Sequence, residues 1–289
     1  MGLLSGLEKF GLSVMEELDI TDDGKKKEVE ARAKESAEKK YSEEDFVFEK
    51  QLTCPVCNRK FPNLVVLSTK LKRLEPDSDL RPNHEAIDTL KYEITSCPSC
   101  GYSAMNKFFD HLSQAQIKWI REAVGEKFES VSADSKPSYT YDEACDRYKL
   151  ALVCAMAKRA RLSEKSLICL RLAWLRRGQI KQMPHTTPEE LEAVKELKTE
   201  MDGFYKQAYE GFQKAISVES PPFCGMNTNT LEYLLANMAL YFKDFAKAGR
   251  FVGKLQTDPN TPQRVKDKCY VLKEEILAEM KKANENKDE

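Results

Sequence analysis

Four cysteines stand in two short pairs that have the pattern of metal ligands. Cys54 and Cys57 belong to the segment CPVC, and Cys97 and Cys100 belong to the segment CPSC. Two C-x2-C pairs are the expected halves of a four-cysteine zinc site, because each pair forms a tight turn that aims two thiolates at one ion. The sequence therefore predicts one structural zinc ion. Iron bound by the same four thiolates is the alternative.

The residues beside each pair fit a metal-binding turn. Pro55 and Pro98 fix φ inside the two turns. Gly101 follows the second pair and supplies the left-handed backbone conformation that often closes such a turn. Arg59 and Lys60 follow the first pair, where we expect them to offset the net negative charge of a zinc tetrathiolate.

The two pairs are separated by 39 residues, 58–96. This separation exceeds the usual 15 to 20, so we expect a loop or hairpin inserted between the two turns. A redox dithiol is the main alternative at a single C-x-x-C pair, but two matched pairs with prolines favour metal. A catalytic zinc site usually needs a non-thiolate ligand. The nearby His84 lies in a proline-rich segment and is interpreted as a loop residue.

The remaining cysteines and histidines form no recognisable motif. Cys224 lies in a predicted loop, but a nucleophilic thiol needs a histidine partner, and no motif joins it to His111 or His185. No P-loop, dinucleotide-binding or hydrolase motif is present, and we therefore expect no enzymatic activity. Four other cysteines fall in predicted helices, where we interpret them as small buried hydrophobes: Cys145, Cys154, Cys169 and Cys269.

Composition narrows the class of protein. The 289 residues include 46 basic and 47 acidic side chains, so the net charge of −1 argues against a globally basic nucleic-acid binder. No apolar run approaches the roughly 18 to 20 residues that span a bilayer. The N-terminal segment also lacks the basic head and cleavage site of a secretory signal. We expect a cytoplasmic protein that does not contact membranes.

The sequence divides into five segments by composition. Residues 1–20 carry an apolar stripe, which we expect to dock into a groove of the helical domain, in cis or in a dimer. Residues 21–45 are a charged helix or linker. Residues 46–108 contain β-branched segments and are interpreted as a zinc-knuckle unit, residues 109–281 as a helical domain, and residues 282–289 as a flexible tail. The stripe consists of Leu3, Leu7, Phe10, Val14 and Leu18.

Helical periodicity and capping residues predict seven helices in the C-terminal segment. We expect them near residues 113–128, 141–160, 163–177, 188–217, 230–242, 244–256 and 262–281. Predicted capping boxes pair Ser113 with Gln116, Thr140 with Glu143, Thr187 with Glu190 and Asn229 with Glu232.

Small and aromatic residues recur at one spacing in three of these helices. The pattern is typical of the second helix of a tetratricopeptide repeat, where small residues allow two helices to approach closely. An irregular helical bundle is the alternative. The three copies are Ala144, Tyr148 and Ala151; Ala208, Phe212 and Ala215; and, more loosely, Ala248, Val252 and Leu255.

Charge is unevenly distributed between two predicted helical regions. Residues 141–181 contain ten basic and four acidic side chains, whereas residues 188–219 contain four basic and eight acidic side chains. The simpler interpretation is that the two regions pack side by side and compensate each other. The alternative is a basic groove for nucleic acid or for an acidic peptide.

The segments MGLLSGLEKFGL, CPVCNRKF and CPSCGYSA, together with the helical remainder, resemble the uncharacterised bacterial proteins of domain-of-unknown-function family 2225. The resemblance covers nearly the whole chain, and the paired cysteines are its most specific part. It implies a zinc knuckle followed by tetratricopeptide-like helices, with Cys54, Cys57, Cys97 and Cys100 as ligands. The family brings no established activity.

We therefore expect an α+β, mainly α fold, in which a small four-cysteine zinc-knuckle unit precedes an α-helical domain with tetratricopeptide-like pairs. The expected function is a non-catalytic cytosolic scaffold or adaptor whose helical groove binds a protein partner. A homo-oligomer is compatible with this function. A nucleic-acid-binding protein that uses the knuckles and the basic helices 141–181 is the alternative, and a metal- or thiol-dependent enzyme is a further one.

Overall fold

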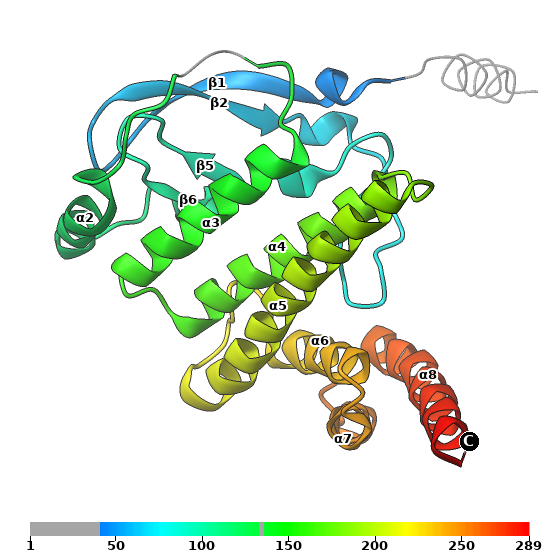
Figure 1. Cartoon of the computed structure of the whole chain (residues 1–289). Helices are drawn as coiled ribbons and strands as arrows, with labels where there is room; N and C mark the ends of the chain where they lie inside the picture. Colours follow the sequence, from blue (N-terminus) through cyan, green and yellow to red (C-terminus); the bar gives the residue numbers. More distant parts are fainter. Residues whose placement is uncertain (1–40, 133–135, 289) are drawn as a thin grey trace, which may run out of the picture. The chain divides into compact units, whose positions relative to one another are not determined.

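The computed structural model describes residues 41–132 and 136–288 (Figure 1). The apolar docking segment predicted for residues 1–20 and most of the predicted linker lie outside the described residues. The folded unit begins with a short 3-10 helix, Glu43–Phe46. The last three residues predicted for the linker therefore belong to the folded unit.

Two antiparallel hairpins carry the cysteine pairs. Strands β1 (Val47–Thr53) and β2 (Lys60–Val66) pair along their whole length. Strands β5 (Ile94–Ser96) and β6 (Ser103–Met105) form a shorter hairpin. In each hairpin the turn between the strands contains one C-x2-C pair. The hairpin therefore sets the orientation of the two cysteine side chains.

The segment between the two hairpins is the predicted insertion. It contains a minimal hairpin of β3 (Arg73–Leu74) and β4 (Asn83–His84), followed by a 3-10 helix, Thr89–Tyr92. We call residues 67–93 the inserted segment. Its loop residue Asp79 is buried between two helices of the C-terminal region, which anchors the insertion to the rest of the unit.

Seven α-helices follow in the described part of the chain, as predicted, with ends that differ from the predicted ends by a few residues. A π-helical turn, Arg121–Gly125, extends the first of them, and the last one continues to Asp288. The helices are α2 (Gln114–Ile120), α3 (Tyr141–Ala157), α4 (Leu162–Gln182), α5 (Pro188–Val218), α6 (Thr228–Tyr241), α7 (Phe245–Thr257) and α8 (Gln263–Asp288).

Three of the four predicted capping boxes are present, at the starts of α2, α3 and α5. The fourth prediction is wrong. Helix α6 begins two residues earlier, and Asn227 caps it by accepting a hydrogen bond from the Thr230 backbone N–H. Asn229 therefore lies inside the first turn. Glu232 is buried and pairs with Lys254 of α7 instead of capping.

The main core is formed by the helices together with part of the cysteine-bearing region. Helices α4 and α5 make the most extensive contact, and α6 packs on α7. All nine residues of the small and aromatic pattern are buried, which agrees with their predicted role in helix packing. Leu90, Ile94 and Met105 join the same core. Residues 46–108 and 109–281 therefore share a core, and position 108 marks a change of secondary structure within one unit.

None of the helices in the described ranges is both long and apolar enough to cross a lipid bilayer.

Candidate metal centre

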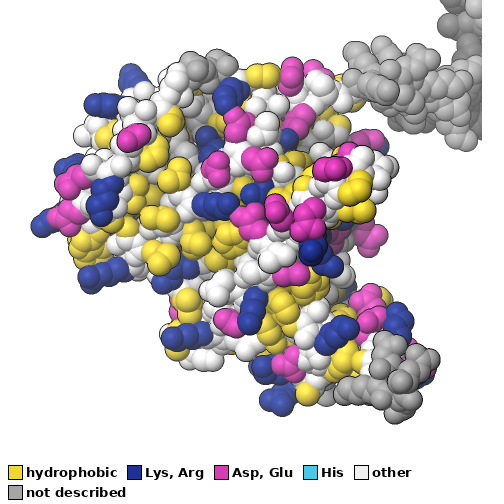
Figure 2. All heavy atoms as spheres, viewed as in Figure 1, with side chains coloured by type: hydrophobic (Ala, Val, Ile, Leu, Met, Phe, Trp, Pro, Cys, Tyr) yellow, Lys and Arg dark blue, Asp and Glu magenta, His cyan; other side chains and the backbone are white. Residues whose placement is uncertain are grey.

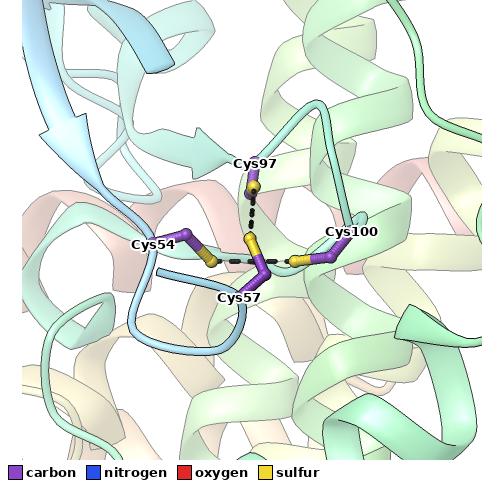
Figure 3. A group of neighbouring side chains, drawn as sticks. All are labelled: Cys54, Cys57, Cys97 and Cys100. Carbon is purple, nitrogen blue, oxygen red and sulfur yellow. Dashed lines mark hydrogen bonds between the residues drawn. The ribbon is translucent and has the colours of Figure 1, made fainter. Parts of the chain in front are cut away.

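The four predicted ligands converge on one point (Figure 3). The Sγ atoms of Cys54 and Cys100 are 3.7 Å apart, and those of Cys57 and Cys97 are 3.6 Å apart. All four sulfurs lie within 4.8 Å of one another. A tetrahedral ion with bonds of about 2.3 Å to sulfur requires sulfur separations of about 3.8 Å. The cluster therefore has the dimensions of a four-thiolate metal site.

The two cysteine turns have the same backbone geometry. In the first turn, the Cys54 N–H donates to the Arg59 carbonyl (3.0 Å) and the Asn58 N–H donates to the Cys54 carbonyl (2.9 Å). In the second turn, the Cys97 N–H donates to the Tyr102 carbonyl (2.8 Å) and the Gly101 N–H donates to the Cys97 carbonyl (3.0 Å). Residues 54–59 and 97–102 are thus equivalent halves of one site.

Each turn is closed by a residue with positive φ. Gly101 has φ +69°, as predicted, and Asn58 occupies the equivalent position with φ 60°. Asparagine is one of the few residues other than glycine that adopts this conformation at low cost. A Cβ atom on Gly101 would lie 2.4 Å from Cδ2 of Phe128. Glycine is therefore required at position 101 for close packing as well as for backbone conformation.

Backbone N–H groups donate to the sulfurs in both halves. Those of Val56 and Cys57 favour the Cys54 thiolate, and those of Ser99 and Cys100 favour the Cys97 thiolate. Hydrogen bonds with Cys100 and then Cys54 lower the pKa of the Cys97 thiol to about 2. The neighbouring sulfurs raise the pKa of Cys100. Without a cation, only the Cys97 thiolate is favoured, because neighbouring thiols and burial raise the pKa of Cys54 and Cys100. A bound cation would stabilise the other thiolates as well.

The cluster is enclosed by protein on most sides. Cys54, Cys97 and Cys100 are buried, and Cys57 is half-buried. Apolar side chains of the α2 region, including Ile120 and Val124, pack against it. Four thiolates complete a tetrahedral coordination shell, and a buried shell leaves no open position for a substrate.

Three contacts around the cluster could not be predicted from the sequence. Arg121 donates from Nη2 to the Val56 carbonyl at 2.9 Å, which places a guanidinium beside the first turn. Cys154 of α3 lies against the second turn, where its sulfur accepts from the Ser103 N–H at 3.4 Å. These residues, like Phe128, lie far from the cysteine pairs in sequence. In contrast, Asn58 could have been recognised from its position four residues after Cys54.

The other candidate residues lie outside the cluster. His84 is in β4, where its Nδ1 atom is 3.3 Å from Thr89 Oγ1. Arg59 and Lys60 are exposed beside the first turn. Cys224 lies 3.7 Å from Ser163 Oγ and contacts neither His111 nor His185 among the described contacts. Cysteines 145, 154, 169 and 269 are buried in helices, as predicted.

Most of the ten basic residues in 141–181 have partners within the unit. Lys149 and Arg176 pair with Glu200 of α5, and Arg161 pairs with Glu219, which agrees with the expected compensation between the two regions. The inserted segment supplies a second set of acids. Arg177 binds Asp79 at 2.8 Å, Lys181 lies 3.6 Å from Asp77, and Arg171 lies 3.2 Å from Glu93.

The face shown in Figure 2 agrees with this pairing, because basic and acidic side chains are interspersed over the helices. Of the remaining basic residues, Lys158 pairs with Glu164 at 2.7 Å, and the Arg159 guanidinium stacks on Trp119 at 4.5 Å. The excess positive charge of residues 141–181 is therefore largely used inside the molecule.

The cysteine hairpins and the helical core lie within the region that matches a known family. A family profile described as "Uncharacterized protein conserved in bacteria (DUF2225)" matches residues 47–276, which include both cysteine pairs and most of α8. The chain belongs to the DUF2225 family. The expected resemblance is thereby confirmed for most of the chain.

No curated protein and no solved structure is significantly similar to this chain. Within the DUF2225 family, the fold of this member is mainly helical, with small hairpins that carry a four-cysteine cluster. The family description assigns no activity.

Proposed function

We propose that this DUF2225 protein is a non-catalytic cytosolic scaffold whose cysteine cluster holds one structural zinc ion. Four thiolate ligands at tetrahedral spacing favour zinc, which takes this ligand set in structural sites. The burial of the cluster supports a structural role, because a catalytic zinc ion requires a position open to water or substrate.

The ion would join the two cysteine hairpins, whose apolar side chains meet in one small buried cluster. The β1–β2 hairpin and the β5–β6 hairpin each contribute two ligands. Each hairpin has only two strands, and isolated two-stranded hairpins are marginally stable in water. A zinc ion bound by both would hold the hairpins together and fix them against α2 and α3.

A groove between α5 and α7 supports the second part of the proposal, which is binding of a protein partner. The groove has a volume of about 230 Å3. Ile216 and Phe251 supply apolar contact area. Arg250 and Lys247, which pairs with Asp244 at 2.9 Å, line its edge. Charge complementarity therefore favours an acidic, amphipathic segment of another protein as the occupant.

The groove is the observation that favours a scaffold over a protein that only binds metal. The test is affinity purification of the full-length protein from its native host, followed by mass spectrometry. It is repeated with the double variant Lys247→Glu, Arg250→Glu. The matched control is Lys195→Glu, Lys198→Glu, which makes the same charge change on an exposed part of α5.

We expect a partner that the wild-type and control proteins retain and that the groove variant loses. The partner's binding segment should be acidic, and a synthetic peptide of that segment should bind the purified protein. A partner set that is identical for all three proteins would show that the groove is not the binding surface.

A further inference from the structure

A cavity of about 310 Å3 lies away from the cysteine cluster, where the inserted segment meets the N-terminus of α3 and the C-terminal turn of α4. Its volume is at the lower end of the range for small-molecule sites. Three cationic side chains line it, Arg81, Lys91 and Lys181, together with two carboxylates, Glu43 and Asp88. The lining therefore carries more positive than negative charge.

Two of these cations are buried and still have unused donors. The Arg81 side chain is 7% exposed, and it donates from Nη2 to Asp88 (2.6 Å) and from Nη1 to Asn83 (2.6 Å). Each of these nitrogens carries a second hydrogen. The Lys91 side chain is 8% exposed, and its ammonium group makes one hydrogen bond, to Glu43 at 2.5 Å. An ammonium group has three donors.

The acceptors around the cavity are already engaged. Asp88 Oδ2 accepts from Arg81 and from the Tyr141 hydroxyl (3.1 Å), and Asp88 Oδ1 accepts from the Leu90 N–H (3.2 Å). Glu43 accepts from Lys91 and from the Tyr92 hydroxyl (2.6 Å). The two carboxylates are thus held by groups of the cavity itself, and the remaining hydrogens of Arg81 and Lys91 are available to a further acceptor.

The wall that holds Arg81 is fixed by its contact with α4. A Cβ atom on Gly178 would lie 2.6 Å from Asp88 Oδ2 and 2.7 Å from Arg81 Nη2. The Arg81–Asp88 ion pair thus packs directly against the backbone of α4 at Gly178. Its guanidinium also donates from Nε to the Trp174 carbonyl at 3.1 Å, so the orientation of Arg81 is set before any ligand arrives.

We propose that this cavity binds a small molecule through a carboxylate or phosphate group. Arg81 and Lys91 would bind the oxyanion at the floor, where they are buried. Lys181 lies at the mouth, where its side chain is 58% exposed and 3.6 Å from Asp77; it would leave Asp77 to bind the oxyanion. Cations in a partly dehydrated site bind oxyanions through short charge-assisted hydrogen bonds.

The test is isothermal titration calorimetry of the metal-loaded, full-length protein at constant ionic strength. Inorganic phosphate and citrate are the probes, and sodium chloride is the reference salt. Lys181→Ala should weaken binding by about tenfold, since it removes one charge-assisted contact. Glu43→Gln should tighten binding, because it removes a negative charge that competes for Lys91. Lys195→Ala removes an exposed lysine from α5 and should leave binding unchanged.

Circular dichroism and metal content would establish that each variant is folded. Binding of phosphate alone, or of citrate alone, would identify the oxyanion class. The proposal is overturned if neither probe binds at millimolar concentration. It is also overturned if Lys195→Ala and Lys181→Ala weaken binding equally, which would indicate attraction to the surface in general.

Discussion

Asp79 of the inserted segment accepts a hydrogen bond from the indole N–H of Trp174 at 2.8 Å, although the two residues are 95 positions apart in the sequence. The same carboxylate accepts from the Tyr205 hydroxyl at 2.9 Å and pairs with Arg177 at 2.8 Å. One buried side chain therefore joins the inserted segment to both α4 and α5. This contact positions the segment that leads into the second cysteine turn.

Replacing Asp79 should destabilise the protein strongly. Asp79→Ala leaves the buried donors of Trp174 and Tyr205 without an acceptor and removes the nearer partner of Arg177, which keeps only Asp77 at 3.5 Å. Breaking a buried ion pair costs about 3–5 kcal/mol. Denaturant unfolding of the metal-loaded protein would measure the loss. Glu192→Ala, which removes an exposed carboxylate paired with Lys195, should change the free energy of unfolding by less than about 1 kcal/mol. Similar values for the two variants would contradict the assigned role.

The Asp79 contact should also depend on pH. Burial disfavours the charged carboxylate, but the hydrogen bond and charge of Arg177 outweigh this effect and lower the pKa of Asp79 below its ordinary value of 3.8. A carboxyl group with a lowered folded pKa stabilises the fold above the unfolded pKa, and this contribution is lost as pH falls through the folded pKa. The stability difference between wild type and Asp79→Asn should therefore shrink below about pH 4. A pH-independent difference would argue against an ionised Asp79.

Metal analysis should find one zinc ion per chain, held by the four-cysteine cluster. Cys97→Ser should lose most of the bound metal and destabilise the two hairpins, because structural zinc contributes on the order of 10 kcal/mol of apparent binding free energy in small domains. Cys154→Ser is the matched control, since this buried thiol touches the second turn but is not a ligand. If iron were found in place of zinc, the four-cysteine site would stand and only the identity of the ion would change. A metal content near zero after reconstitution would refute the site.

Gly101 and Phe128 should be energetically coupled. Gly101→Ala places a Cβ against the Phe128 ring and forces alanine to a φ of +69°. The conformational part alone costs about 1–2 kcal/mol. The loss should be smaller in a Phe128→Ala background, where the clash is removed. Asn58→Gly, at the equivalent position of the first turn, should be nearly neutral. A double-mutant cycle by thermal or denaturant unfolding measures the coupling, and its absence would mean that the ring moves away freely.

Purified protein should not shift labelled DNA or RNA at about 150 mM salt, because nucleic-acid binding needs free cations facing the phosphates. Arg161, Arg176 and Arg177 are engaged in ion pairs with residues of the same chain. Arg159 is the informative position for a variant, since it is exposed and stacks on Trp119. A shift that Arg159→Glu weakens would support the nucleic-acid alternative.

The sequence was sufficient to predict features that depend on a few neighbouring residues. The cysteine turns were predictable because proline, glycine and cysteine at fixed spacing determine a local geometry. Helix starts at Ser113, Thr140 and Thr187 were predictable for the same reason. The error at α6 shows the limit of such signals, because Asn227 and Asn229 are both plausible caps by type. The structure has Asn227 as the cap, and Glu232, the expected partner of Asn229, pairs with Lys254.

Features that depend on distant residues could not be predicted. The sequence indicated that the basic residues of α4 would be compensated, but the acids 188–219 supply only part of that charge. Asp77, Asp79 and Glu93 supply much of the rest, and nothing local distinguishes them from solvent-exposed acids. The oxyanion cavity could not be predicted for the same reason. Arg81, Lys91 and Lys181 come together only when the inserted segment packs against α4.

The 39 residues between the cysteine pairs also set the delay between synthesis of the first cysteine turn and synthesis of the second. At about 5–20 residues per second of translation, the first turn leaves the ribosome a few seconds before the second. During that interval, Cys54 and Cys57 have only half of the ligand set. The packing around the cluster is completed later still, when α3 brings Cys154 against the second turn. The nascent chain therefore passes through a stage in which Cys54 and Cys57 lack the second half of the cluster.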